Sequence, residues 1–97
     1  RIVKLTFKPE YIASFERIFE ESKNGILAFE GCTMVELYQD MADSNIFFTY
    51  SFWDSESHLN NYRKSDFFKM VWGNTNKLFV DKPEAWSVTK IQSTNPS

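Results

Sequence analysis

The side chains of this sequence that could take part in chemistry are mostly aromatic rings with a polar atom, together with several amides. They are two indoles, two phenols and three amides, at Trp53, Trp72, Tyr50, Tyr62, Asn60, Asn61 and Asn74. Such groups can hold an electron-rich aromatic compound, exclude water from it and stabilise its anion by hydrogen bonds. The chemistry they suggest is one in which the bound compound supplies the reactive atoms.

These residues also have explanations in packing alone. Trp53 ends a predicted strand and Trp72 lies on the apolar side of a predicted helix, where an aromatic ring usually serves the core. Asn74 fits a solvent-facing position on that helix, and His58, near a helix start, fits a surface position. Gly73 predicts either a break in the helix or a close approach of a ligand or backbone, because an interior glycine costs about 1 kcal/mol relative to alanine.

The rarity of cysteine and histidine limits other kinds of site. The chain has one cysteine, Cys32, and one histidine, His58, which excludes an internal disulfide, a multi-thiolate zinc site and a histidine-rich metal cage. No glycine-rich nucleotide loop or metal-ligand spacing is present. We therefore expect no metal and no cofactor. Cys32 opens a predicted strand, so we expect a small buried side chain there rather than a nucleophile.

Charge and hydropathy exclude further classes of protein. The 97 residues include 11 Lys and Arg against 13 Asp and Glu, a formal net charge of −2. Nucleic acids and anionic membranes need a concentrated positive field, so neither is expected as a partner. No apolar run reaches the roughly 20 residues that span a bilayer, and no signal-peptide pattern opens the sequence. We expect a cytoplasmic protein.

Hydrophobic periodicity and turn residues predict the elements that must position these side chains. Strands are expected at 1–8, 32–39, 46–53 and 85–91, a helix from Pro9 to the Asn24-Gly25 pair, and helices that begin at Ser55 and Ser65, the second reaching Phe79. The order is β-α-β-β-α-β, the α+β ferredoxin-like topology with a four-stranded antiparallel sheet. We expect one domain at 1–92 and a flexible polar tail at 93–97.

Both faces of the predicted sheet carry apolar side chains. In the strand at 46–53 one face bears Ile46, Phe48, Tyr50 and Phe52, and the other bears Phe47, Thr49, Ser51 and Trp53. Helices on one face cannot cover the other, and soluble proteins seldom expose a large apolar face. We therefore expect a homodimer in which two sheets pack face to face.

Trp53, Tyr62, Ser65 and Phe68 follow one another at spacings of nine, three and three residues. This pattern, followed by a helix and a closing strand, resembles the antibiotic biosynthesis monooxygenase family, which belongs to the dimeric α+β barrels. The resemblance extends over nearly the whole chain. The typical family core has histidine at the position of Tyr62. Because that histidine is the group that titrates near neutral pH, its replacement weakens any mechanism that needs a general base.

The resemblance implies a small aromatic ligand between the sheet and the helices of each subunit. Several family members oxygenate such a ligand with dioxygen and without metal or flavin. A related branch degrades haem with a histidine on the last helix, where this sequence has Trp72, so we expect no haem degradation. The residues expected to bind the substrate are Trp53, Tyr62, Phe68, Trp72 and Asn74.

Two functions stay open at this point. One is a cofactor-independent monooxygenase acting on a small aromatic or quinol-type compound. The other is a non-catalytic small-molecule-binding or stress-related dimer of the same fold, since a fold does not determine a function. An RNA-binding module of the same topology is disfavoured, because neither central strand contains the segment K/R-G-F/Y-G/A-F-V-x-F/Y and the net charge is negative.

Overall fold

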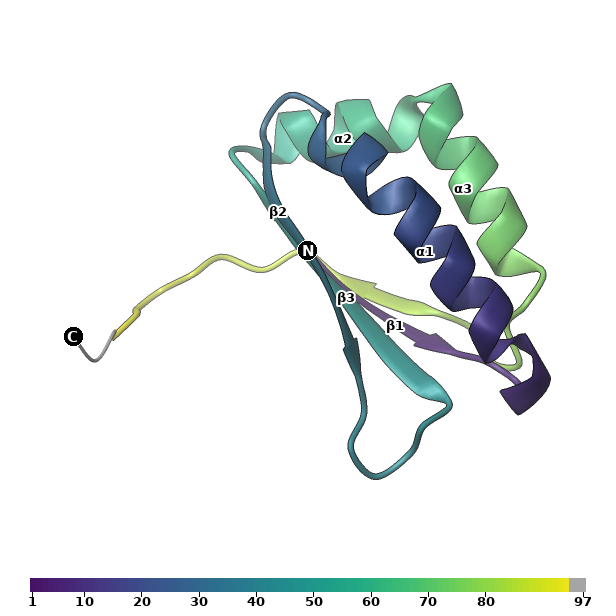
Figure 1. The fold of residues 1–97 in the computed structure, drawn as a ribbon. Coiled ribbons are helices and arrows are strands. Elements are labelled where there is room, and N and C mark those ends of the chain that lie inside the picture. The colour runs from purple at the N-terminus through teal and green to yellow at the C-terminus, as the bar shows by residue number, and fades with distance from the viewer. Residues whose placement is uncertain (95–97) are drawn as a thin grey trace.

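The computed structural model describes residues 1–94, in which all the helices lie on one face of an antiparallel sheet (Figure 1). The elements in chain order are β1 (Ile2–Thr6), the 3-10 helix η1 (Pro9–Tyr11), α1 (Ile12–Leu27), β2 (Cys32–Gln39), β3 (Ile46–Trp53), α2 (Glu56–Lys64), α3 (Asp66–Asn76) and β4 (Glu84–Trp86). The strand order across the sheet is β2-β3-β1-β4. The predicted ferredoxin-like fold is confirmed. Of the predicted tail at 93–97, residues 95–97 lie outside the described residues.

Local sequence signals account for where several elements begin. Ser55 and Ser65 have extended backbones, and their hydroxyl oxygens accept hydrogen bonds from the backbone N–H groups of His58 and Phe68, at 3.2 and 3.1 Å. Each serine therefore satisfies an N–H group that the first turn of its helix would leave free. β2 and β3 have the predicted bounds and pair as the predicted hairpin.

The predicted end of the first helix is wrong. α1 continues through the Asn24-Gly25 pair to Leu27. A Cβ atom on Gly25 would lie 2.4 Å from the ring of Phe67 on α3. Glycine therefore serves close packing of α1 against α3, whereas the residue that adopts a positive φ, of 86°, is Gly31.

The last helix and the last strand are shorter than predicted. α3 ends at Asn76 and does not reach Phe79, whose backbone instead forms an isolated bridge with Phe7. The helix is not broken at Gly73, and apart from its chain neighbours and the backbone of its own helix no described atom lies within 4 Å of where a Cβ would stand there. β4 covers only Glu84–Trp86 rather than 85–91, because its pairing with β1 is confined to those residues.

The two faces of the sheet have different surroundings. Leu5, Phe7 and Phe47 point toward the helices and are at most 3% exposed. Among residues 1–94 no helix covers the opposite face (Figure 1). By the strand register the apolar side chains on that face are Ile2, Met34, Tyr38, Ile46, Phe48, Tyr50, Phe52 and Trp86, and Lys4, Thr6, Glu36 and Glu84 lie on it too. One copy of the chain therefore covers one face of its sheet.

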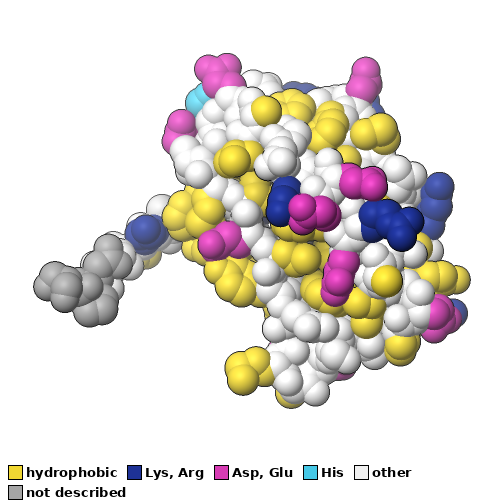
Figure 2. All heavy atoms as spheres, viewed as in Figure 1, with side chains coloured by type: hydrophobic (Ala, Val, Ile, Leu, Met, Phe, Trp, Pro, Cys, Tyr) yellow, Lys and Arg dark blue, Asp and Glu magenta, His cyan; other side chains and the backbone are white. Residues whose placement is uncertain are grey.

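The described surface has mixed charge. On the face shown in Figure 2, Lys and Arg side chains are interspersed with Asp and Glu, in keeping with the net charge of −2. Among residues 1–94, no helix combines the length and the apolar character that crossing a membrane would require.

Candidate functional site

A cavity of about 350 Å³ lies between the helix-facing side of the sheet and the three α-helices. Val3 of β1 and Thr49 and Ser51 of β3 form part of its floor. Val3 pairs with Thr49, and strand alternation places Ser51 on the same face. Small-molecule sites occupy about 300–1,000 Å³. The cavity is therefore large enough for a small ligand.

Four of the five residues predicted to bind a substrate line this cavity together: Trp53, Tyr62, Phe68 and Trp72. Their rings form a continuous series, which we call the aromatic wall. The ring centroids lie 5.1 Å apart for Trp53 and Tyr62, 5.2 Å for Tyr62 and Phe68, and 6.0 Å for Phe68 and Trp72. Asn74 is exposed on α3 and does not line the cavity. The binding roles of the wall residues stay a prediction.

Sequence spacing explains why the four rings meet. Phe68 and Trp72 lie four residues apart on α3, so they share a face of that helix. Ser65 ends α2 and caps α3, and the change of direction brings Tyr62 edge-on against Phe68. Trp53 ends β3 on the helix-facing side, where its ring stacks on Tyr62 with 24° between the planes.

The polar atoms of the aromatic wall are restricted in what they can do. Nε1 of Trp53 donates a hydrogen bond to Oγ of Ser51 at 2.9 Å, so this indole already has an acceptor. Burial, together with the nearby Cys32, raises the pKa of Tyr62 to about 12. Tyr62 is therefore protonated at neutral pH, where its hydroxyl can donate a hydrogen bond but cannot act as a general base.

Two arginines at the cavity were not among the predicted site residues. Arg1 reaches it from the start of the sheet and Arg63 from the last turn of α2. The backbone N–H of Ser51 donates to the carbonyl oxygen of Arg1 at 3.0 Å, which extends the pairing of β1 with β3. Residues two apart on a strand lie on the same face, so Arg1 is on the same face as Val3, and this spacing is the sequence signal that could have identified Arg1. Arg63 had no comparable signal.

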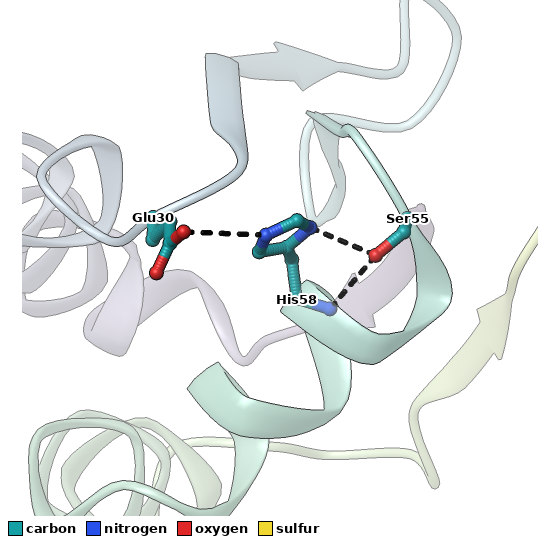
Figure 3. A network of polar contacts seen from close by, with 3 residues as sticks. All are labelled: Glu30, Ser55 and His58. Carbon is teal, nitrogen blue, oxygen red and sulfur yellow. Dashed lines mark hydrogen bonds and ion pairs between the residues drawn. The ribbon is translucent and has the colours of Figure 1, made fainter.

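A second cluster has the residue types of a hydrolase triad: Ser55, His58 and Glu30 (Figure 3). Oγ of Ser55 lies 2.8 Å from Nδ1 of His58, and Nε2 of His58 lies 3.8 Å from Oε1 of Glu30. A triad base must be held by a hydrogen bond that its ring N–H donates to the third member, and 3.8 Å is too long for one. Neither His58 nor Glu30 lines the cavity. We interpret the cluster as a link between the loop before β2 and the start of α2.

His58 was expected at the surface, and 30% of its side chain is exposed. The residue is half-buried against Gly31, where an added Cβ atom would lie 2.3 Å from Cγ of the His58 ring. The loop can pass so close to the imidazole because Gly31 has no side chain and tolerates its φ of 86°. The environment of His58 therefore depends on a residue far from it in sequence.

Other candidate reactive groups carry little chemistry. Cys32 is half-buried at the start of β2, and burial raises the pKa of its thiol, which makes it a poor nucleophile. In the part of the chain that the structure describes, no three His, Cys, Asp or Glu side chains are grouped so as to hold a metal ion. The cavity and its aromatic wall are therefore the candidate functional site.

Comparisons with known proteins agree with this fold. The family model described as "Antibiotic biosynthesis monooxygenase" matches residues 1–71. A conserved protein from Methanosarcina mazei Go1 is similar in structure, with a TM-score of 0.82 at 24% identity over 86% of this chain and 82% of that one. A protein from Nitrosomonas europaea named for the antibiotic biosynthesis monooxygenases has a TM-score of 0.87 at 11% identity over 97% of this chain and 90% of that one. No significant match to a curated protein is found.

Proposed function

This chain belongs to the antibiotic biosynthesis monooxygenase family, and we propose that it is a cofactor-independent monooxygenase that oxidises a small aromatic or quinol-type compound. The observation that supports this most directly is the aromatic wall along a cavity of about 350 Å³. Trp53, Tyr62, Phe68 and Trp72 offer both ring faces and ring edges to a bound aromatic compound. Asn74, which is exposed, is not part of the proposed site.

The reaction must rely on a substrate that ionises easily. An anthrone is an example: its ring CH₂ group and one O₂ become a ring C=O group and one H₂O, and the substrate supplies all four electrons. The protein would remove water from the substrate, orient it and stabilise its anion. Tyr62, held neutral by burial, is suited to donating a hydrogen bond to that anion. A strongly basic residue is not needed when the substrate is itself acidic.

We also propose that the protein acts as a homodimer. The face of the sheet without helices carries Phe48, Tyr50 and Phe52 in one row of β3, and these side chains are only half-buried in a single chain. A second copy packed on this face would bury them and leave the cavity, on the opposite face, open to a ligand. Phe48→Lys at the centre of that face should yield a monomer in sedimentation, while Lys23→Glu on α1 should leave the dimer intact. A wild-type monomer would contradict this proposal.

The test of the function begins with native mass spectrometry of freshly purified protein, to find any retained aromatic compound. Oxygen uptake is then measured with that compound, an anthrone, a hydroquinone and a polyphenol. We expect Trp72→Leu to reduce uptake at least tenfold, because it removes one end of the aromatic wall. Asn74→Ala, on the same helix but outside the cavity, should retain full activity. Tight binding without uptake of oxygen would instead favour the non-catalytic ligand-binding alternative.

A further inference from the structure

Two positively charged side chains, those of Arg1 and Arg63, line the same cavity. Arg1 is half-buried and Arg63 is exposed, so the cavity meets solvent beside Arg63. Within residues 1–94 the basic and acidic side chains that lie within 4.0 Å of each other are Lys23 with Glu20 and His58 with Glu30, the second an ion pair only when the imidazole is protonated. Neither arginine therefore has a carboxylate within 4.0 Å in this part of the chain.

The environment of Arg1 is unfavourable for its own charge. Burial first, and the charge of Arg63 second, lower the pKa of the Arg1 guanidinium. Asp54 and Glu56 lie with Arg1 around a neighbouring hollow, yet neither comes within ion-pair distance. Two like charges beside an apolar cavity are stabilised most effectively by an anion placed between them.

The remainder of the cavity is suited to the uncharged part of the same molecule. Among the described residues that line it, Tyr62 has the one other ionisable side chain, and that side chain is neutral at physiological pH. The cavity thus has aromatic rings along its wall and positive charge at its opening. Guanidinium groups bind carboxylates and other planar oxyanions through two parallel hydrogen bonds.

We propose that Arg1 and Arg63 determine specificity for an aromatic anion, whose ring lies against the aromatic wall and whose carboxylate or phenolate oxygen lies between the two guanidiniums. The inference rests on the proposed function of this cavity and narrows its substrate class. The pair also has a consequence for reactivity: it favours the ionised form of a bound phenol. A substrate held as its anion needs no general base at the position of Tyr62.

A simpler role for Arg63 makes a different prediction. Arg63 and Lys64 both lie in the last turn of α2, where cations interact favourably with the free carbonyl groups of the helix end. Lys64 does not line the cavity. If the helix end were the whole explanation, removing either charge would have the same small effect. Lys64→Gln is therefore the matched control for Arg63→Gln.

The experiment compares two probes of nearly equal shape, 2-naphthoate and the neutral 2-naphthamide, by calorimetric titration. We expect wild-type protein and Lys64→Gln to bind the carboxylate at least tenfold more tightly than the amide. Arg63→Gln and Arg1→Gln should lose most of this preference with little change in affinity for the amide. The preference should also shrink as salt is raised, since Arg63 is exposed.

A second readout tests the phenolate. The absorption spectrum of 2-naphthol, followed against pH, should show a lower pKa for the compound bound to wild-type protein than for the free compound. That difference should be reduced in Arg63→Gln and retained in Lys64→Gln. A purely structural role of Arg63 would not alter the ionisation of a ligand.

Two results would overturn the inference. One is equal affinity of the wild-type protein for 2-naphthoate and 2-naphthamide. The other is an equal loss of the preference for the carboxylate in Arg63→Gln and Lys64→Gln. Either would show that the arginines do not select an anion. Either result would leave the proposed oxygenation intact for a neutral aromatic substrate. If neither 2-naphthoate nor 2-naphthamide bound, the proposed ligand site would be contradicted as well.

Discussion

The two ends of the layer between sheet and helices contain similar aromatic contacts but differ in how completely they are filled. At the closed end, Phe7 contacts Phe15, Phe47 and Phe79, with ring centroids 4.3 to 5.9 Å apart. At the open end, the aromatic wall has centroids 5.1 to 6.0 Å apart, yet it borders a cavity of about 350 Å³. Aromatic content therefore does not determine whether a region becomes core or pocket.

The difference arises on the sheet side of the layer. At the closed end the strands present Phe7 and Phe47, which are large and at most 2% exposed. At the open end the inward positions of β3 are Thr49 and Ser51, which are too small to reach the helices. Small side chains on the floor leave the space that the rings above do not occupy.

The largest expected effect is at the closed end. Phe7→Ala removes the one fully buried large side chain that the described residues contain and should lower the free energy of unfolding by about 3–5 kcal/mol. Phe68→Ala at the open end should cost less than half as much, because Phe68 already borders empty space. Urea unfolding of both variants measures this. Equal losses would mean that the two ends are equally packed.

Alkaline pH should reveal the burial of Tyr62. Its folded-state pKa is raised from 10 to about 12, so between these values the unfolded chain has lost a proton that the folded chain keeps. Stability should therefore be fully present below pH 10 and fall by roughly 2–3 kcal/mol by pH 12. Urea unfolding at pH 9, 10 and 11 gives the free energy of unfolding as a function of pH. Tyr62→Phe should show a smaller decrease over this range than the wild-type protein. If the free energy of unfolding decreased equally in the variant and in the wild-type protein, the pKa of Tyr62 would not be raised by folding.

The loop beside the open end should be more sensitive to an added methyl group than the helix above it. Gly31→Ala combines a positive φ with a Cβ atom 2.3 Å from the His58 ring, and should destabilise the protein by about 1–3 kcal/mol. Gly73→Ala inside α3 meets no described atom within 4 Å and should stabilise it by up to about 1 kcal/mol. Thermal unfolding should therefore show a lower melting temperature for Gly31→Ala and a higher one for Gly73→Ala than for the wild-type protein. Loss of stability in both variants would place a neighbour against Gly73.

The smallest expected effect comes from adding bulk. Thr49→Phe at the open end should change the free energy of unfolding by less than about 1 kcal/mol, since the new ring enters existing space, while abolishing binding of 2-naphthoate. Phe7→Trp at the closed end should cost about 1–3 kcal/mol, because no space is present there. Chemical denaturation and calorimetric titration on the same preparations provide both values. Retained ligand binding in Thr49→Phe would place the ligand elsewhere.

Local patterns predicted the features that depend on neighbouring residues. The hairpin of β2 and β3 has its predicted bounds, since alternation and turn residues act over a few positions. Ser55 and Ser65 cap their helices because the hydroxyl bonds an N–H three residues on. The grouping of four wall residues also follows from spacing along β3, α2 and α3.

Features that depend on distant contacts were predicted poorly. Gly25 was expected to end a helix, but it lies under Phe67. Asn74 was expected at the site, but the rotation of α3 on the sheet leaves it in solvent. Arg63 was overlooked because no local pattern indicates that its helix brings it to the same cavity as Arg1.

By itself the sequence determined the order of the elements, the ferredoxin-like fold, the family and the aromatic character of the candidate site. Each of these depends on residue types and spacings within one element or its neighbours. Only the tertiary structure decided that Thr49 and Ser51 lie beneath the aromatic wall and that two arginines line the same cavity. A cavity is the volume left between elements distant in sequence, so it depends on their relative placement and on side-chain sizes from both sides at once.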